Sequence, residues 1–495
     1  MEASMPIETD PAFSVEPIDV LIIGAGISGI GCACYLQREL PGKSWEIVEA
    51  RETFGGTWDL FKYPGIRSDS DLYTFSYDFK PWTSPNALAS AEEIMSYLKE
   101  AAEEHNVLER ISYNRKVVSA SWESDEALWT VTIENSQTGA RETRKCRWLF
   151  GATGYYDYDE GFRPAFEDED AFHGPKIHPQ FWPEDFDYSG KRVAIIGSGA
   201  TAVTLVPSMT DRAAHVVQVQ RTPTYIMPRP KQDKVALWLK KWLPPKVAYG
   251  LTRWKNTRVQ RWFYLYCQKF PNRARRLIRK LNRQHLPADY PVDVHFKPPY
   301  NPWDQRLCAV PDADFFKDIS AGRASIVTGH IERFTPAGIQ MKSSEHVDAD
   351  AIIIATGLKL KMMGGIDFTV DGKPVDVSDH LVFKGLMLDG IPNYSFAIGY
   401  TNSSWTLKVG LVCGYLCKLL KEMDRQGKTV CIPRRPEGEI VTRPLMDFGA
   451  GYVKRAVASM PKQGDDYPWE MSSDYTTDIA LFKRGKVIDP ALELF

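Results

Sequence analysis

The chain of 495 residues has few cysteines and no long apolar run. Its eight cysteines are scattered and none forms a C-x-x-C pair, so neither a zinc site nor a thioredoxin-like redox pair is indicated, and we expect no metal site. No stretch approaches the ~18 apolar residues that a membrane span needs. Met1 to Glu16 lack the basic and apolar regions of a signal peptide. We therefore expect a cytoplasmic protein.

The chain also lacks a strong net charge, but its charges are segregated. The formal net charge is −2, whereas the stretch from Arg229 to Arg283 holds 17 Lys or Arg and one acid, Asp233. Hydrophobic residues at 43% and charged residues at 25% are average for a folded globular protein, which excludes a disordered or fibrous chain. The length predicts two or three domains.

A dinucleotide-binding motif follows the first strand-like run. The β-branched run from Ile18 to Ile23 leads into a G-x-G-x-x-G turn at Gly24, Gly26 and Gly29, and a helix-like stretch and a second strand-like run follow, ending at Glu49. The first glycine permits the tight turn, the second lets a pyrophosphate approach the backbone, and the third lets helix and strand pack closely. An acid at this spacing accepts hydrogen bonds from a ribose 2′-hydroxyl, which predicts an FAD-type adenosine site.

The same arrangement recurs about 170 residues later. The strand-like run from Arg192 to Ile196 precedes a G-x-G-x-x-A turn, and the next run, His215 to Gln220, ends in Arg221. The turn consists of Gly197, Ser198, Gly199, Ala200, Thr201 and Ala202. A guanidinium at the strand end can bind a 2′-phosphate with charge-assisted hydrogen bonds, so this unit predicts an NADPH site.

Two further strand-like runs end in Ala-Thr-Gly and are typical of points where a chain crosses between domains. These are Trp148 to Gly154 and Ala351 to Gly357. We therefore expect an α/β protein with two Rossmann-like dinucleotide-binding domains and a helical insertion. The predicted bounds are 1–154 and 357–495 for a discontinuous FAD domain, 155–228 and 300–356 for the NADPH domain, and 229–299 for a basic helical subdomain.

Helical periodicity replaces the strand pattern in the basic stretch. Three sets of apolar residues recur at helical spacing, with prolines between the sets: Val235, Trp238, Leu239, Trp242 and Leu243; Val259, Trp262, Phe263 and Tyr266; Ala274, Leu277, Ile278 and Leu281. One interpretation is a subdomain that packs its apolar faces on the NADPH domain and leaves its basic faces solvated. A second is peripheral contact with an anionic membrane. Nucleic-acid binding is the third, but no known nucleic-acid module accompanies the charge, so we expect no nucleic-acid partner.

Two fingerprints indicate a family. The pattern F-x-G-x-x-x-H-x-x-x-W-P runs from Phe172 through His178 to Trp182 and Pro183, and G-G-x-W-x-x-x-x-Y-P-G-x-x-x-D runs over residues 55–69. The chain thereby resembles the type I Baeyer–Villiger monooxygenases, which are class B flavin-dependent monooxygenases. Stretches such as GGTWDLFKYPGIRSDSD and GYTNSSWTLK are most similar to the ethionamide-activating branch. The related flavin N- or S-oxygenating monooxygenases carry Tyr or Phe where this chain has Trp182, and they remain the alternative.

The resemblance implies an enzyme that uses FAD, NADPH and O₂ to convert a ketone into an ester or lactone through a C4a-peroxyflavin, with sulfide oxidation as a side activity. The family's catalytic arginine corresponds to Arg306 and its partner aspartate to Asp69. A fixed guanidinium suits the stabilisation of an anionic intermediate. His178 and Trp182 are expected at the domain junction and not as chemical bases.

The resemblance also implies the cofactor contacts. Those for FAD are Ser28, Glu49, Gly56, Thr57, Trp58, Asp59, Leu60, Asp69 and Val117. Those for NADPH are Arg67, Ser68, the turn Gly197 to Ala202, Arg221 and Thr222. A disulfide reductase would share both nucleotide units, but the pairs Cys32/Cys34 and Cys413/Cys417 lack the spacing of a redox pair. A nucleotide-sensing protein without catalysis would require Arg306 and Asp69 to be idle.

Overall fold

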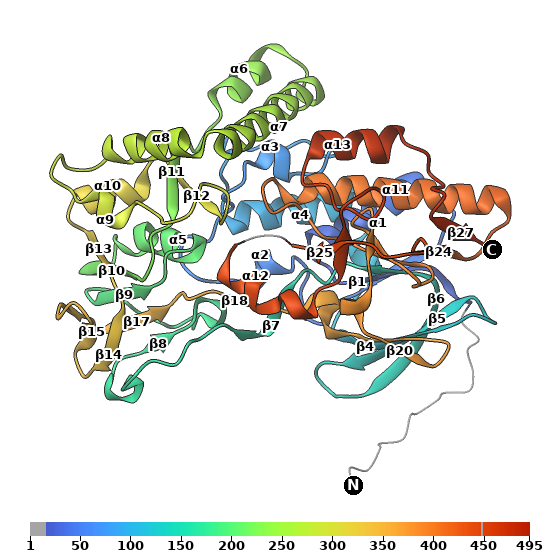
Figure 1. Ribbon diagram of the computed structural model, residues 1–495, viewed down its shortest axis with the longest axis horizontal. Helices are drawn as coiled ribbons and strands as arrows, with labels where there is room; N and C mark the ends of the chain where they lie inside the picture. Colours follow the sequence, from blue (N-terminus) through green and yellow to red (C-terminus); the bar gives the residue numbers. More distant parts are fainter. Residues whose placement is uncertain (1–15, 447–448) are drawn as a thin grey trace, which may run out of the picture.

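The computed structural model describes residues 16–446 and 449–495. Two β-sheets lie side by side, and helices cover their upper sides in the view of Figure 1. The segment that we searched for a signal peptide lies outside the described residues, except for Glu16. Among the described helices, none is both long enough and apolar enough to cross a bilayer.

The larger sheet has nine strands and joins two arrangements at β6 (Arg141–Gly151). β6 pairs in parallel with β1 (Ile18–Ile23) on one side and antiparallel with β5 (Leu128–Asn135) on the other. The other strands are β2 (Trp45–Val48), β3 (Ile111–Ser112), β4 (Arg115–Glu123), β19 (Asp367–Val370), β20 (Lys373–Val375) and β23 (Tyr394–Phe396). Their order is β20-β19-β4-β5-β6-β1-β2-β3, and β23 also pairs with β6. The C-terminal part of the chain thus completes the sheet in which the first turn lies.

The run Ile18–Ile23 is strongly apolar because its strand lies inside the sheet. Ile22 is opposite Ile47 of β2 and Phe150 of β6, and all three side chains are fully buried. They belong to a core that also contains residues of α1 (Ile27–Glu39) and α11 (Trp405–Gln426). Each such buried side chain stabilises the fold by roughly 1.5–3 kcal/mol.

The cysteines are part of this packing. All eight are buried free thiols. Cys32 and Cys34 of α1 lie in the same core as Cys413 and Cys417 of α11. Burial raises the pKa of Cys34 and of Cys417 to about 12, so these thiols stay protonated and unreactive.

The second sheet has five parallel strands in the order β13-β10-β9-β17-β8. They are β8 (Lys176–Ile177), β9 (Arg192–Ile196), β10 (His215–Gln220), β13 (Ala324–Thr328) and β17 (Ala351–Ile354). α5 (Ala200–Met209) lies between β9 and β10 in the chain, so the second turn connects a strand to a helix as the motif requires. Both predicted strand–turn–helix–strand units are therefore present.

The two predicted crossovers run next to each other between the sheets. The first continues into β7 (Tyr156–Gly161) and the second into β18 (Leu358–Leu360), and these two strands pair antiparallel. Figure 1 shows this pair in the middle of the molecule, below α12 (Gly451–Ala456).

The remaining helices and strands are short or peripheral. The helices are α2 (Thr57–Leu60), α3 (Leu72–Phe75), α4 (Ala91–Glu104), α6 (Lys234–Trp242), α7 (Pro245–Lys269), α8 (Pro271–Arg283), α9 (Val292–His295), α10 (Asp314–Ser320) and α13 (Tyr475–Ile479). The strands are β11 (Tyr225–Arg229), β12 (Leu307–Pro311), β14 (Ile331–Thr335), β15 (Gly338–Met341), β16 (His346–Asp348), β21 (Val382–Phe383), β22 (Met387–Leu388), β24 (Cys431–Pro433), β25 (Thr442–Pro444), β26 (Lys462–Gly464) and β27 (Leu492–Leu494).

The three helices predicted in the basic stretch exist, but the interpretation in which α6 and α7 pack their apolar sides inward holds only in part. Leu239, Leu243, Phe263 and Tyr266 are half-buried, whereas the other apolar residues of the two sets are exposed, namely Val235, Trp238, Trp242, Val259 and Trp262. Only the small residue Ala236 is buried on α6. In Figure 1 these two helices form the projection at the top of the molecule.

The physical reason is that polar groups as well as apolar ones join α7 to the body of the protein. It packs on α3, where Asp71 accepts a hydrogen bond from Asn256 at 3.0 Å. Buried polar groups need such partners, and this requirement sets which side of the helix turns inward. The helix therefore contacts α3, next to the first nucleotide unit, as well as the NADPH side on which we had placed it.

Candidate active site

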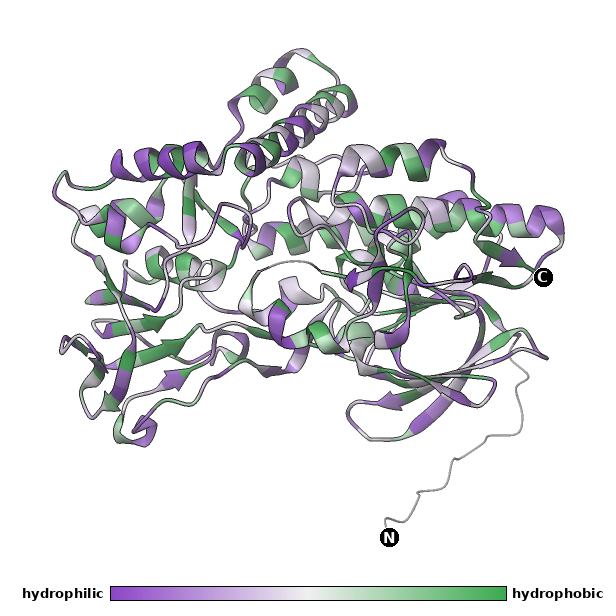
Figure 2. Cartoon of the chain, in the orientation of Figure 1, coloured by the Kyte–Doolittle hydropathy of each residue, from purple (hydrophilic) through white to green (hydrophobic). Residues whose placement is uncertain are grey.

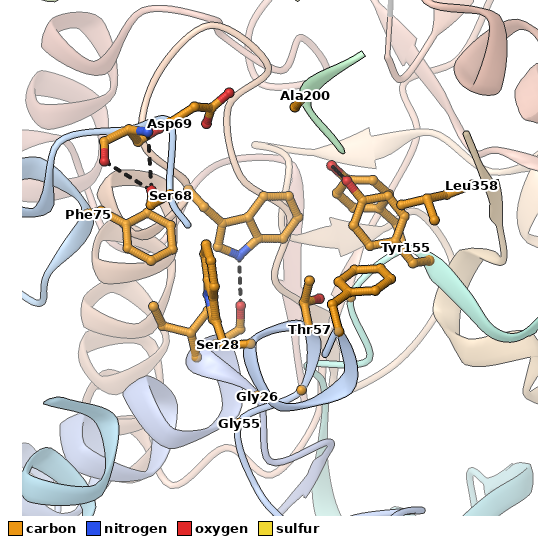
Figure 3. A pocket seen from close by; sticks show the side chains of 18 of the residues that line it. Gly26, Ser28, Gly55, Thr57, Ser68, Asp69, Phe75, Tyr155, Ala200 and Leu358 are labelled. Atoms are coloured by element: carbon orange, nitrogen blue, oxygen red, sulfur yellow. Dashed lines mark hydrogen bonds between the residues drawn. The ribbon is translucent and has the colours of Figure 1, made fainter. Parts of the chain in front are cut away.

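A cavity of about 900 Å³ brings together segments from the whole chain. Its wall includes residues of the first turn, the loop 55–70, the crossover 152–159, the start of α5, β12, α7 and the segment 400–405. Figure 3 shows the side chains that point into it. The described residues contain no cluster of three or more potential metal ligands.

The first turn has the close contacts that its glycines predict. Gly24 has a φ of +101°, and a Cβ atom there would lie 2.7 Å from the Ala152 carbonyl oxygen. A Cβ on Gly29 would lie 1.9 Å from the Gly24 carbonyl oxygen, so helix and strand could not pack as they do. At Gly26 the nearest atom is Gly56 Cα, 3.7 Å from the Cβ position. A Cβ on Gly56 would lie 3.0 Å from Gly26 Cα, so the two glycines pack closely together through backbone that carries no side chain.

The N-terminus of α1 is suited to bind a diphosphate. Its N-cap is Gly26, and no side chain caps the first turn. Gly26, Ile27 and Ser28 line the cavity. Free N–H groups and the positive end of the helix dipole attract phosphate oxygens, so a dinucleotide fits these residues.

Glu49 is held in place at the end of β2. Its carboxylate accepts hydrogen bonds from the Ala25 N–H at 2.6 Å and the Arg51 N–H at 3.0 Å. Burial raises the pKa of Glu49, and these backbone hydrogen bonds oppose that effect. Glu49 and Val117 both line the cavity, as expected for residues at an adenosine site.

Aromatic residues that we did not predict form part of the wall. Trp405 Nε1 donates to Ser28 Oγ at 2.9 Å, and its ring lies 5.2 Å from that of Tyr155 (Figure 3). The Tyr158 hydroxyl lies 3.2 Å from Thr57 Oγ1. The tyrosines directly follow the predicted crossover at Gly154, which was a usable signal. Trp405 lies in a family-like stretch, but nothing in the sequence indicates its partner.

The loop after Gly56 contributes some predicted residues to the cavity and not others. Thr57, Trp58 and Ser68 line it, whereas Asp59 and Leu60 do not. The Asp59 carboxylate instead accepts hydrogen bonds from Arg51 at 2.7 Å and Lys62 at 3.0 Å. A contact of Asp59 and Leu60 with FAD stays a prediction.

Arg67 connects the two nucleotide units. Its Nη1 lies 2.5 Å from Asp314 Oδ2 on α10, beyond the second unit. Its Nη2 is buried and has no hydrogen-bond partner among the described residues, although Arg67 lines the cavity. An anionic group of a bound coenzyme would satisfy this donor.

The second turn is open where the first is enclosed. Ala200 and Thr201 line the cavity, while Gly197, Ser198, Gly199 and Ala202 lie outside its wall. A Cβ on Gly197 would lie 2.3 Å from the Ala355 carbonyl oxygen, and nothing lies within 4 Å of the Cβ position of Gly199. Gly199 is the N-cap of α5 and no side chain caps that helix, so its first N–H groups are free. A second phosphate site is available here.

Arg221 is exposed directly after β10, and Thr222 follows it. The Arg221 guanidinium makes no hydrogen bond or ion pair with any residue that the structure describes. It is therefore free to bind a phosphate. Neither Arg221 nor Thr222 lines the large cavity.

Arg306 and Asp69 face the same cavity but do not form the expected contact. Among the described residues, no ion pair within 4.0 Å joins them. Tyr452, followed by Tyr155, Tyr156 and Asp69, holds the pKa of Arg306 well above its ordinary value against the effect of burial. These tyrosines therefore lie near the guanidinium, and nothing in the sequence identifies Tyr452 of α12 as a neighbour of Arg306.

His178 lies at the junction of the crossovers. Its Nε2 is 3.2 Å from the Gly357 carbonyl oxygen, and its Nδ1 accepts a hydrogen bond from the Gln180 N–H at 3.2 Å. Burial lowers the pKa of His178. The ring is thus neutral at pH 7. Its contact with Gly357 joins the fingerprint segment to the second crossover. Trp182 packs edge-on against Phe186, with 5.6 Å between the ring centroids.

Comparisons with known proteins find similar flavin-dependent monooxygenases. The family model for flavin-binding monooxygenase-like proteins matches residues 18–266. The FAD-containing monooxygenase EthA of Mycobacterium tuberculosis is 48% identical over 96% of this chain and 97% of its own length. The probable FAD-binding monooxygenase AlmA of Acinetobacter baylyi is 47% identical over 96% of this chain and 95% of its own.

Solved structures share the fold. The complex of OTEMO with FAD and NADP has a TM-score of 0.71 at 20% identity and covers 97% of this chain and 99% of that one. The ε-caprolactone-bound cyclohexanone monooxygenase has a TM-score of 0.72 at 19% identity and covers 97% and 100%. These matches confirm the predicted resemblance and fold class. The chain belongs to the flavin-binding monooxygenase-like family.

Proposed function

We propose that this protein is an FAD-containing, NADPH- and O₂-dependent Baeyer–Villiger monooxygenase that converts ketones into esters or lactones and also oxidises sulfides. The observation that carries the proposal is a single cavity whose wall includes the first turn, the start of α5 and Arg306. One ketone, one O₂ and one NADPH with a proton yield one ester, one water and NADP⁺.

FAD binds along the first unit in this proposal. Its diphosphate lies at the N-terminus of α1, where Gly26 leaves the backbone without a side chain. Its ribose hydroxyls donate to Glu49, and its adenine lies against Val117. Trp405 keeps Ser28 oriented toward the cavity. When bound, FAD supplies the activation of O₂ after its reduction by NADPH.

NADPH binds at the second unit. The free N–H groups at the start of α5 take its diphosphate, and the unpaired guanidinium of Arg221 takes its 2′-phosphate. The free Nη2 of Arg67 donates to the coenzyme from the opposite wall. His178 keeps the two crossovers together while both cofactors are bound.

Arg306 stabilises negative charge at the reacting centre. When the carbonyl carbon of a ketone becomes tetrahedral, its oxygen gains negative charge, and a fixed guanidinium nearby lowers the energy of that state. Tyr452, Tyr155 and Tyr156 lie near the guanidinium and raise its pKa, so it stays charged. The aromatic wall of Trp58, Tyr155 and Trp405 keeps water away from this charge, which strengthens the interaction.

The experiment that tests the proposal is product analysis with isotopic oxygen. The purified holoprotein is incubated with NADPH, ¹⁸O₂ and a panel of linear, cyclic and aromatic ketones, and products are examined by mass spectrometry. We expect esters or lactones that contain one ¹⁸O atom. Oxygenation of amines or sulfides without any ketone conversion would identify the flavin N- or S-oxygenating alternative and overturn the proposal.

A further inference from the structure

α7 turns polar side chains toward the protein together with Tyr249 and Phe263, and it leaves a further set of apolar side chains exposed. Asn256 and Gln260 donate hydrogen bonds to the Asp71 carboxylate, and Arg253 donates to the Tyr73 carbonyl oxygen at 2.9 Å. These bonds fix the rotation of the helix about its axis. A surface helix usually packs its apolar residues inward, but this rotation leaves many of those on α7 exposed.

The outward side of α6 and α7 is rich in exposed tryptophan. The exposed fractions are 60% for Trp238, 73% for Trp242, 56% for Trp254 and 65% for Trp262. Further exposed apolar residues of these helices are Val235, Val247, Leu251, Val259 and Leu265. A single exposed hydrophobic residue needs no explanation, but a row at helical spacing marks an interaction surface.

The same surface is positively charged. Residues 234–265 contain eight Lys or Arg and no acid. Lys234, Lys241, Lys246 and Arg258 are exposed and form no ion pair with a described residue. Lys240 is different, because it donates to the Thr83 carbonyl oxygen at 3.0 Å and so points toward the body.

Part of the apolar row lines the cavity. Val259 and Trp262 line the cavity and are also 55% and 65% exposed. The cavity therefore reaches the surface within the apolar side of α7. Figure 2 shows that α6 and α7, which project from the body, contain both hydrophobic and hydrophilic residues, whereas α8 is mostly hydrophilic.

We infer that α6 and the outward side of α7 dock on an anionic lipid membrane, so that the cavity opening at Val259 and Trp262 receives apolar substrate from the lipid. Tryptophan and cationic side chains together suit the headgroup region of an anionic bilayer. A second copy of this chain is a poor occupant, because it would bring two strongly basic surfaces into contact. The delivery of substrate rests on the proposed function, whereas the docking does not.

Docking is tested by sedimentation of the FAD-loaded protein with vesicles. We expect sedimentation with vesicles of phosphatidylglycerol and phosphatidylcholine, little with phosphatidylcholine alone, and release at about 1 M salt, where charges act over only ~3 Å. Absence of sedimentation with the anionic vesicles at low salt would overturn the inference. So would equal sedimentation with both kinds of vesicle.

Two pairs of substitutions locate the surface. The Trp238→Ser/Trp242→Ser and Lys241→Glu/Lys246→Glu variants should each bind anionic vesicles about tenfold or more weakly than the wild type. None of these four residues lines the cavity, so FAD content and turnover of a water-soluble ketone should not change.

The matched controls change the same kinds of residue elsewhere. Val441 is 72% exposed, and Lys342 and Lys373 are exposed. Val441→Ser and Lys342→Glu/Lys373→Glu should sediment like the wild type. If the controls lose binding as much as the α6–α7 variants do, general hydrophobicity or net charge explains the binding and the assigned surface is wrong.

Substrate delivery has its own readout. A long-chain ketone held in anionic vesicles should be converted at least tenfold more slowly by Trp238→Ser/Trp242→Ser than by the wild type, while a soluble ketone is converted equally by both. Equal rates on the vesicle-held ketone would overturn delivery from the lipid. A wild type that sediments but converts no ketone would contradict the proposed function and leave docking supported. A wild-type dimer that the tryptophan substitutions dissociate, without vesicle binding, would assign the surface to self-association.

Discussion

Arg306 is the single residue on which the proposed chemistry depends most. It faces the cavity among Tyr155, Tyr156 and Tyr452, which hold its pKa high. Arg306→Ala should leave FAD bound and lower ester formation at least a hundredfold, about 2.7 kcal/mol, because a preorganised cation is lost at the charged intermediate. Ester formation is followed by gas chromatography.

The control for this variant is Arg333→Ala, an exposed arginine of β14 that does not line the cavity. It should keep wild-type turnover. NADPH oxidation by Arg306→Ala should continue with release of hydrogen peroxide in place of ester. Wild-type ester formation by Arg306→Ala would show that the role carried over from the family does not hold here.

Arg221 is the residue that we expect to determine the preference for NADPH over NADH. Its guanidinium is exposed and unpaired among the described residues, so a 2′-phosphate is its expected partner. Arg221→Ala should weaken NADPH binding by about 1.5–3 kcal/mol, the scale of a hydrogen bond between charged groups, and leave NADH nearly unchanged. Steady-state kinetics with both coenzymes measures this. An equal loss for both would mean that Arg221 does not recognise the phosphate.

At the scale of elements, the junction of β1 and α1 controls flavin binding. A Cβ atom at Gly29 would lie 1.9 Å from the Gly24 carbonyl oxygen, so any side chain pushes the helix away from the strand. Gly29→Val should lose bound FAD and destabilise the fold by about 1–3 kcal/mol. Absorbance of the purified protein gives the flavin content, and thermal unfolding gives the stability.

Gly42 provides the matched control, since nothing lies within 4 Å of its Cβ position. Gly42→Ala should bind FAD like the wild type. If Gly29→Val also remains fully yellow, the FAD site does not depend on the close packing of α1 on β1.

At the scale of the whole molecule, the C-terminal part holds the cavity wall with a buried ion pair. Lys408 of α11 lies 2.7 Å from Asp478, and each side chain is 1% exposed. Asp478 also accepts a hydrogen bond from Tyr400, which lines the cavity. Lys408→Met leaves a buried carboxylate without its cation and should lower the unfolding free energy by about 3–5 kcal/mol. Denaturant unfolding measures the loss.

Two further variants separate charge burial from packing. Lys408→Met/Asp478→Asn removes both charges and should recover most of the lost stability. Lys421→Met changes an exposed lysine of the same helix that forms a surface ion pair with Glu39, and it should lower stability by less than about 1 kcal/mol. A single Lys408→Met variant as stable as the wild type would mean that the pair does not support the wall.

The amino-acid sequence alone was sufficient for the features that depend on local order. The strand, turn and helix around Gly24 and around Gly197 are encoded within about thirty residues each, because a tight turn and close helix packing require glycine or a small residue at set spacings. Helical periodicity likewise predicted α6, α7 and α8. The fingerprint around His178 indicated the family, which the comparisons confirm.

Only the tertiary structure decided which side of each helix is buried and which distant residues meet. Periodicity places Trp254 and Trp262 on one side of α7, but hydrogen bonds from Asn256 and Gln260 to Asp71, nearly 190 residues away, turn that side outward. In the same way, the neighbours of Arg306 include Tyr452 as well as the expected Asp69. Such contacts depend on the free energy of satisfying buried polar groups across the whole fold, and no local pattern carries that information.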